Sequence, residues 1–272
     1  MASIKLTLAI ALMMVAAYAA AAGAQDAIRV DGSTGTAPLI EALGKSFTAK
    51  SKTAVAIGKG LGTKARFEAL AGGKIDIAMA SHGLNVAEVT GMGMTVHRIA
   101  QTPVVFGLHQ SVPVAALTDA QICAIYEKPG RNWKEFGGPD LAVAPFARPD
   151  SEVDAQVVRD GIACLKALKL PDSVKLQARA GDMANALADT PGAIGVTSAT
   201  VVEQSGGKIK AVALNGVAAS EASVLGGQYR MTRDAFLVTG KAPSAAVKAF
   251  IDFVKSPEGA QIIRANGAIA TK

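Results

Sequence analysis

Three short turns rich in glycine, serine and threonine constrain the fold of this chain more than any other feature. They are Asp31-Gly32-Ser33-Thr34-Gly35-Thr36, Gly58-Lys59-Gly60-Leu61-Gly62-Thr63 and Ala80-Ser81-His82-Gly83. Each stands where a strand-like run gives way to a helix-like one. Such a turn leaves backbone N–H groups at a helix start without partners and places hydroxyl donors beside them. The three turns therefore predict one pocket for an anion, at the carboxyl ends of neighbouring strands.

Short apolar strands alternate with helical patterns along the chain, which predicts an α/β fold with mostly parallel sheets. The expected strands are residues 28–30, 54–57, 75–79, 141–146, 192–196 and 209–214, and residues 96–108 are expected to form an extended apolar stretch. The expected helices are residues 37–49, 63–71, a helix capped by Thr118-Asp119, and residues 152–168, 244–254 and 258–266.

The first 24 residues have the pattern of a secretory signal peptide. Lys5 precedes an apolar run over residues 6–22, and Ala22-Gly23-Ala24 provides an A-x-A cleavage site. We expect cleavage after Ala24, and the alternative is an uncleaved membrane anchor. The run contains no lipobox cysteine, so lipid attachment is not expected.

The charge of the chain limits the classes of ligand that it can bind, and its two cysteines leave two structural alternatives. The chain carries a formal net charge of +6, but its Lys and Arg are scattered and only 4% of its residues are aromatic. This disfavours nucleic acid and favours a basic protein that attracts small anions. In an oxidising compartment Cys123 and Cys164 are either a disulfide or two small core residues, and their spacing does not decide between these alternatives.

Common catalytic patterns are missing from the sequence. The glycines at 58–63 do not form a Walker motif, and no Gly-x-Ser-x-Gly elbow is present. His82, His97 and His109 lack metal-ligand spacing, so we expect no metal and no cofactor. A Ser-His-Asp triad stays open because its geometry is spatial. Trp133 lies in a turn outside the expected cleft, which disfavours sugar binding. We expect a protein that is not an enzyme.

Several motifs, in order along the chain, resemble the substrate-binding proteins of phosphate-type ABC transporters. They are Gly32-Ser33-Thr34, Gly60-Leu61-Gly62-Thr63, Gly73-Lys74-Ile75-Asp76-Ile77-Ala78-Met79-Ala80-Ser81, Asn132-Trp133, Pro191-Gly192-Ala193-Ile194-Gly195 and Ser256-Pro257-Glu258-Gly259-Ala260. The resemblance implies a two-lobed periplasmic binding protein, each lobe a mostly parallel sheet flanked by helices, with two crossing hinge segments. Lobe one is expected at 25–103 plus 229–272 and lobe two at 104–228. The implied protein is a periplasmic monomer that captures a small anionic solute such as phosphate and delivers it to ABC transporter membrane subunits.

The resemblance also implies the ligand-binding residues. They are Ser33, Thr34, Thr36, Gly62, Thr63, Ser81, His82, Arg148 and Ser151. The hydroxyls and N–H groups would donate hydrogen bonds, and Arg148 would offer a bidentate fork to an oxyanion. For the hydroxyls, helix capping is the alternative role. For Arg148, the alternative is an ion pair with Asp150 or Asp154.

Two positions depart from the family pattern. His82 follows the serine of the third turn, where family members have an acidic residue or arginine. Residues 150–154 (Asp-Ser-Glu-Val-Asp) replace the family's Ser-Gly-Thr donors after Arg148. Carboxylates beside a dianion repel it, so the identity of the anion stays open. The alternative function is an exported interaction or sensory module, or an enzyme, on the same scaffold without phosphate binding.

Overall fold

The computed structural model describes residues 27–128 and 130–271, so the predicted signal peptide lies outside the described residues. The strands are β1 (Ile28–Gly32), β2 (Val55–Ile57), β3 (Ile77–Ser81), β4 (Thr95–His109), β5 (Ala116–Leu117), β6 (Ala144–Ala147), β7 (Lys175–Leu176), β8 (Ala193–Ser198), β9 (Ile209–Ala211), β10 (Ala213–Leu214), β11 (Thr232–Thr239) and β12 (Ile269–Ala270).

The α-helices are α2 (Ala37–Ser51), α3 (Thr63–Ala71), α4 (Val86–Gly91), α5 (Asp119–Glu127), α6 (Val153–Gly161), α7 (Ala180–Asp189), α8 (Ala199–Gln204), α9 (Glu221–Leu225), α10 (Ala245–Lys255) and α11 (Pro257–Ala265). Two 3-10 turns, η1 (Trp133–Phe136) and η2 (Ala163–Leu165), complete the described elements. In the part of the chain that the structure describes, no helix is long and apolar enough to cross a bilayer.

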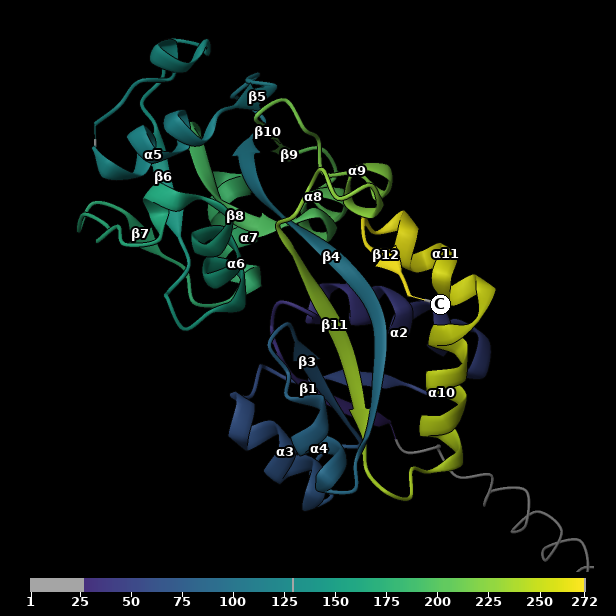
Figure 1. Ribbon diagram of the computed structural model, residues 1–272. Coiled ribbons are helices and arrows are strands. Elements are labelled where there is room, and N and C mark those ends of the chain that lie inside the picture. The colour runs from purple at the N-terminus through teal and green to yellow at the C-terminus, as the bar shows by residue number, and fades with distance from the viewer. Residues whose placement is uncertain (1–26, 129, 272) are drawn as a thin grey trace, which may run out of the picture.

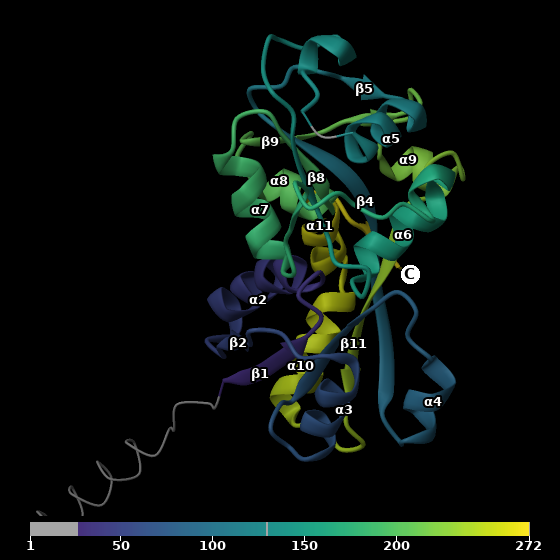
Figure 2. The ribbon, with the colours of Figure 1, turned by 90° about the vertical axis from the view of Figure 1, so that its left-hand side faces the viewer.

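Two lobes share a mixed sheet whose order is β2-β1-β3-β11-β4-β8-β6-β7. Within each lobe the central strands are parallel: β1 pairs with β2 and β3, and β6 pairs with β7 and β8. The long strands β4 and β11 pair with each other in antiparallel fashion and run between the two lobes (Figure 1 and Figure 2). This arrangement confirms the predicted α/β, two-lobed fold with two crossing segments.

Each lobe has its own apolar core, which explains the alternation of apolar strands and amphipathic helices. In the first lobe, Ile40 and Leu43 of α2 pack on Val30 and Ile77 of the sheet. In the second lobe the core includes Trp133, which is completely buried and donates from Nε1 to the Gly192 carbonyl at 2.8 Å. Trp133 is therefore a core residue. Burial of such apolar area is the dominant stabilising contribution to each lobe.

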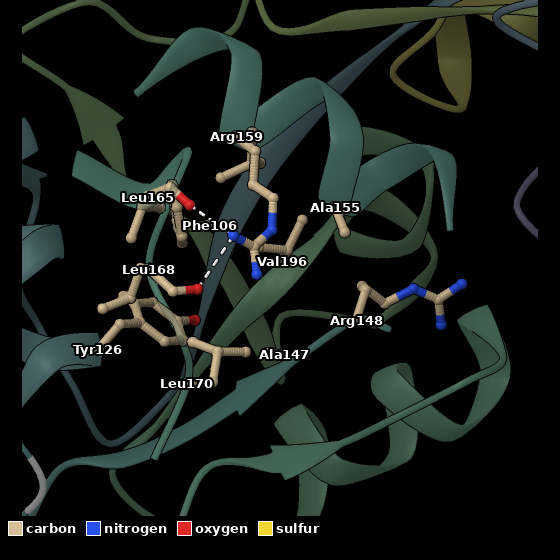
Figure 3. Close-up of a pocket in the computed structure, with 11 residues that line it drawn as sticks. Phe106, Tyr126, Ala147, Arg148, Ala155, Arg159, Leu165, Leu168, Leu170 and Val196 are labelled. Atoms are coloured by element: carbon tan, nitrogen blue, oxygen red, sulfur yellow. Dashed lines mark hydrogen bonds between the residues drawn. The ribbon is translucent and has the colours of Figure 1, made fainter. Parts of the chain in front are cut away.

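The predicted helix over residues 152–168 is wrong in its second half. Helix α6 ends at Gly161, Ile162 is extended, and η2 follows. Glycine is a poor helix former. Arg159 Nη1 also donates to the carbonyls of Leu165, at 2.6 Å, and Leu168, at 3.1 Å (Figure 3). These bonds hold the segment after Gly161 in a turn, so an uninterrupted helix does not form.

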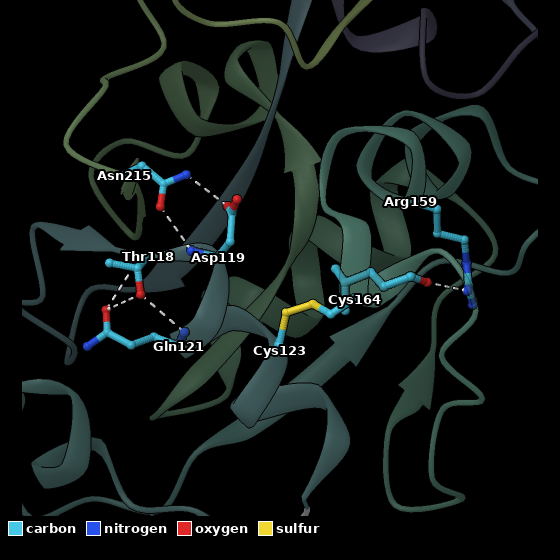
Figure 4. The surroundings of a disulfide bond; sticks show 8 residues. Thr118, Asp119, Gln121, Cys123, Arg159, Cys164 and Asn215 are labelled. Atoms are coloured by element: carbon cyan, nitrogen blue, oxygen red, sulfur yellow. Dashed lines mark hydrogen bonds between the residues drawn. A yellow bond between two sulfur atoms is a disulfide. The ribbon is translucent and has the colours of Figure 1, made fainter.

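Cys123 and Cys164 form a disulfide, which settles the alternative that the sequence left open. Their Cα atoms lie 6.2 Å apart, within the usual range for a bridge. The bond links α5 to η2 (Figure 4). The 41-residue separation between the two cysteines spans β6, Arg148 and α6. The disulfide therefore constrains the segment that carries Arg148 and Ser151, the two site residues predicted in lobe two.

Candidate functional site

The three turns of the first lobe are held together by hydrogen bonds. Leu61 N donates to Gly32 O at 3.0 Å, which joins the second turn to the first. Ser33 N donates to Met79 O at 3.0 Å, and the Thr36 hydroxyl donates to Ala80 O at 3.3 Å. These bonds attach the first turn to the end of β3. The turns lie at the carboxyl ends of parallel strands, as the sequence predicts, and form one polar surface.

Two helices begin at this surface without side-chain caps. Thr36, which precedes α2, accepts no capping hydrogen bond on its side chain, and Gly62, which precedes α3, has no side chain that could accept one. Within the described residues, the hydroxyls of Ser33 and Thr34 make no hydrogen bond either. Capping therefore does not occupy these two hydroxyls. Free N–H groups and free hydroxyls at two helix starts are suited to binding an anion.

The structure adds Arg66 to this surface, a residue that the sequence analysis missed. Its Nη2 donates to the Thr63 hydroxyl at 2.6 Å and its Nη1 to Met79 O at 2.9 Å. Desolvation by burial lowers the pKa of Arg66 from its ordinary value. Because Thr63 accepts this bond, its own hydroxyl proton remains available to a ligand. In the sequence, Thr63 and Arg66 stand three positions apart on an expected helix, a spacing at which side chains are neighbours, and this could have indicated the contact.

Ser81 and His82 lie at the third turn in different surroundings. The Ser81 side chain is buried and its hydroxyl donates to Asp234 O at 3.1 Å. The His82 side chain is 57% exposed, with Nδ1 3.8 Å from Asp234 Oδ2. His82 also lines a groove of about 760 Å³ that is lined by Gln156 of α6 as well. His82 is therefore on the rim of the inter-lobe region.

Arg148 projects from the end of β6 and is almost completely buried. Its Nη1 donates to Gln177 O at 2.8 Å and its Nη2 to the Glu152 carboxylate at 2.9 Å. No described residue accepts a hydrogen bond from its Nε. Figure 3 shows the guanidinium turned away from Arg159 and from the small apolar pocket beside it. The predicted guanidinium is present, but it already has a carboxylate partner.

The ion pair of Arg148 differs from both alternatives that the sequence suggested. Asp150 pairs instead with Arg159, at 2.7 Å. Asp154 pairs with Arg233. Pairing of Arg148 with Asp150 or Asp154 is therefore wrong, because α6 begins at Val153 and directs Glu152, its N-cap residue, back toward Arg148.

Ser151, the other site residue predicted in lobe two, has different surroundings from Arg148. It is exposed at the turn before α6, and it makes no hydrogen bond with Arg148. The buried acidic residue at the start of α6 is Asp154, with 5% of its surface exposed. The first turn of α6 therefore presents carboxylates where the family pattern has hydroxyl and N–H donors.

Arg233 is the second residue that sequence reasoning missed. It lies on the crossing strand β11 and is 1% exposed. Its Nη2 donates to Gly35 O at 2.6 Å, and its Nε lies 2.7 Å from Asp154 Oδ1. Arg233 therefore contacts the first turn of lobe one and the first turn of α6 in lobe two. Nothing in the local sequence around residue 233 indicates these long-range contacts.

The three histidines are separate, and no group of metal-ligating side chains is found among residues 27–128 and 130–271. His97 Nε2 lies 3.2 Å from the Thr239 hydroxyl, and His109 Nδ1 lies 2.7 Å from the Ser111 hydroxyl. Each ring therefore has a local polar partner on its own part of the sheet.

The fold and the polar turns correspond to a class of solute-binding proteins. The chain matches the family model of the PBP superfamily domain over residues 18–258, and it belongs to this family of periplasmic binding proteins. It is 28% identical over 252 residues to Protein SphX of Synechococcus elongatus, an alignment that covers 83% of this chain and 72% of SphX.

Solved structures show the same fold. A putative phosphate ABC transporter substrate-binding protein with bound phosphate, from Clostridium perfringens, superposes with a TM-score of 0.72 at 27% identity. That comparison covers 91% of this chain and 100% of the other. An ABC-type phosphate transport receptor from Vibrio cholerae superposes with a TM-score of 0.59 at 24% identity, over 89% of this chain and 99% of the other.

Proposed function

We propose that this chain is an exported solute-binding protein that captures phosphate or a related small anion between its lobes for an ABC transporter. The observation that carries this proposal is the convergence of two helix starts without side-chain caps, at α2 and α3, with the Ser33 and Thr34 hydroxyls, which make no hydrogen bond to any residue that the structure describes. Such a surface binds anions through N–H groups and neutral donors. The similarity to a phosphate-bound protein from Clostridium perfringens supports the same ligand class.

The lobes and the partners follow from this proposal. Lobe one comprises residues 25–103 and 229–272, and lobe two comprises residues 104–228. The two lobes rotate about β4 and β11, the anion is enclosed on closure, and the membrane subunits of a transporter recognise the closed form. The protein acts in the periplasm as a monomer and without a catalytic step.

The proposed ligand-binding residues of lobe one are Ser33, Thr34, Gly62 and Thr63. The hydroxyls of Thr36 and Ser81 donate to carbonyl oxygens in this structure, so each would contact an anion only after exchanging that bond. In lobe two, Arg148 is the proposed cation, and Ser151 is proposed to contact ligand at the rim. His82, which belongs to lobe one, is also proposed to contact ligand at the rim.

The alternative, a module that has lost solute binding, is not favoured by the family comparisons. A thermal-shift series separates the two. We expect one anion among phosphate, phosphonates, sulfate, molybdate and small carboxylates to raise Tm by about 5–10 °C at 100 times its Kd. Ser33→Ala should reduce the shift, and Thr95→Ala, an exposed change at the far end of β4, should leave it unchanged. No shift with any anion would overturn the proposal.

A further inference from the structure

Arg233 is a buried cation whose hydrogen-bonding capacity is only partly used by the described residues. The residue is 1% exposed, and no described residue accepts a hydrogen bond from its Nη1. Its Nε is close to Asp154 Oδ1, but neither atom makes an aligned hydrogen bond. A buried guanidinium normally directs its five N–H donors at acceptors. Two nitrogens of this one have no aligned acceptor in the described protein, which is costly in a buried place.

The guanidinium also lies directly against the first turn. A Cβ atom added to Gly35 would be 3.3 Å from Arg233 Cζ and 3.4 Å from both Nη1 and Nη2. The bond from Nη2 to Gly35 O fixes the same edge of the guanidinium to the backbone between the Thr34 and Thr36 hydroxyls. Arg233 therefore adds a positive charge to the turn that carries the free Ser33 and Thr34 hydroxyls.

On its other side, the guanidinium faces an internal anion. Asp154 is 5% exposed and lies on α6, which packs so closely on the segment before β11 that a Cβ at Gly161 would be 2.9 Å from Met231 Cγ. Asp154 thus approaches Arg233 from lobe two while Gly35 contacts it from lobe one. An oxyanion that approached Arg233 would have to share or replace the Asp154 carboxylate.

We propose that Arg233 is a further anion-binding and specificity-determining residue of the inter-lobe site, and that Asp154 is an internal counter-ion which competes with the solute. The proposal rests on the proposed anion-binding function. In the unliganded protein the Arg233–Asp154 pair keeps the two lobes in contact. When β4 and β11 bend and the lobes separate, Arg233 stays with lobe one and Asp154 moves away on α6. The solute then takes the place of Asp154 beside Arg233 before the lobes close.

The decisive comparison is between wild type and Asp154→Asn, which keeps the size of the side chain and removes its charge. Titration calorimetry with inorganic phosphate and with sulfate should show about tenfold tighter binding of at least one of these anions to Asp154→Asn, because the competing charge is gone. Arg233→Gln should bind at least tenfold more weakly than wild type. Arg230→Gln, an exposed change on the same segment, should match wild type.

The possible results separate this inference from the proposed function. Wild type that binds phosphate, with Asp154→Asn equal or weaker, would show that Asp154 is only a structural contact and would overturn the inference while leaving the function intact. Binding by Asp154→Asn alone would support the inference and identify Asp154 as the group that blocks phosphate. Absence of binding in both proteins would overturn both. Circular dichroism of each variant establishes that it is folded, and if Arg233→Gln does not fold, Asp154→Asn decides alone.

Discussion

Arg148 Nη2 donates to the Glu152 carboxylate at 2.9 Å, so a guanidinium expected to meet a solute is neutralised by a residue four positions later. The Arg148 side chain is 1% exposed, whereas that of Glu152 is 34% exposed. The carboxylate can therefore move toward solvent more easily than the guanidinium can. This difference makes Glu152 the residue expected to yield to an incoming anion.

Glu152→Gln should strengthen anion binding. Removal of the carboxylate charge leaves Arg148 with a formal charge that a bound anion would compensate. A charge-assisted hydrogen bond contributes about 1.5–3 kcal/mol, so we expect the affinity for the anion to rise by about tenfold. The matched control is Asp150→Asn, which removes one charge from an exposed carboxylate that pairs with Arg159 instead. Calorimetry with phosphate measures both, and an equal effect of the two changes would point to general electrostatics rather than to Arg148.

Gly35→Ala should weaken binding without unfolding the protein. The new Cβ would be 3.3 Å from Arg233 Cζ, a contact that the guanidinium can relieve only by moving away from the turn. We expect a loss of at least fivefold in anion affinity and a small loss of stability, about 1 kcal/mol. Gly91→Ala, at the end of α4, is the control, because a Cβ there meets nothing within 4 Å. Equal affinities for the two variants would speak against a role for Arg233.

Loss of the disulfide should destabilise the protein. Cross-linking residues separated by 41 positions is expected to contribute about 4 kcal/mol by restricting the unfolded chain. The double variant Cys123→Ser, Cys164→Ser should show a correspondingly lower free energy of unfolding in urea. Wild type under reducing conditions should resemble this variant. If oxidised and reduced wild type gave indistinguishable urea unfolding curves, the disulfide would not contribute to the free energy of unfolding.

The pH dependence of stability should contain a contribution from His97. Burial, and next the nearby charge of Lys255, lower the pKa of His97 from 6.5 to about 4. Above pH 6.5 the imidazole is neutral in both states. Between about pH 6.5 and pH 4 the unfolded chain takes up a proton that the folded protein does not, so stability falls as the pH falls. Below about pH 4 the folded protein is protonated as well, and this contribution stops changing.

The variant His97→Gln should lose that part of the acid destabilisation. Urea unfolding of wild type and variant at pH 7 and pH 4.5 measures it, with His82→Gln as a control at an exposed histidine. The expected difference is less than the full shift would give, since His97 is only half-buried and water screens part of its interactions. The same decline with pH in wild type and His97→Gln would assign the effect to other groups.

The regular part of the fold could be predicted from the sequence. Helix α3 spans Thr63–Ala71 as expected, and α2 begins at Ala37 as expected, because each follows a glycine-containing turn that sharply marks its start. Strand β4 was expected from its long apolar run. These elements depend on neighbouring residues in the chain, which a single sequence displays directly.

The less regular elements could not be predicted in this way. Helix α7 (Ala180–Asp189) is rich in alanine and shows little apolar contrast, so it was not expected. The expected strand over residues 209–214 divides into β9 and β10, since Val212 N bonds to Phe106 O while Ala213 turns to pair with β5. The bounds of β9 and β10 depend on pairing with strands that are distant in the sequence.

In the candidate site, too, the local features could be predicted from the sequence and the long-range contacts could not. The three turns were found because their composition is itself the signal. The hydroxyls of Ser33 and Thr34 make no hydrogen bond to residues 27–128 or 130–271. Arg66 and Arg233 were missed because their significance lies in contacts with Met79 and Gly35, and the second of these crosses 198 positions of sequence. The pairing of Arg148 with Glu152 depends on where α6 begins, which the sequence did not define.

Isothermal titration with inorganic phosphate measures anion capture by the wild-type protein. The protein is first unfolded and refolded to remove any anion carried through purification. We expect saturable binding of one anion per chain, with a Kd below about 10 μM, by phosphate or by one of the related oxyanions used in parallel. We also expect Arg148→Gln to lower the affinity at least tenfold. Folded protein that gives no binding heat with any of these anions, over a temperature range that excludes a cancelling enthalpy, would contradict the proposed function.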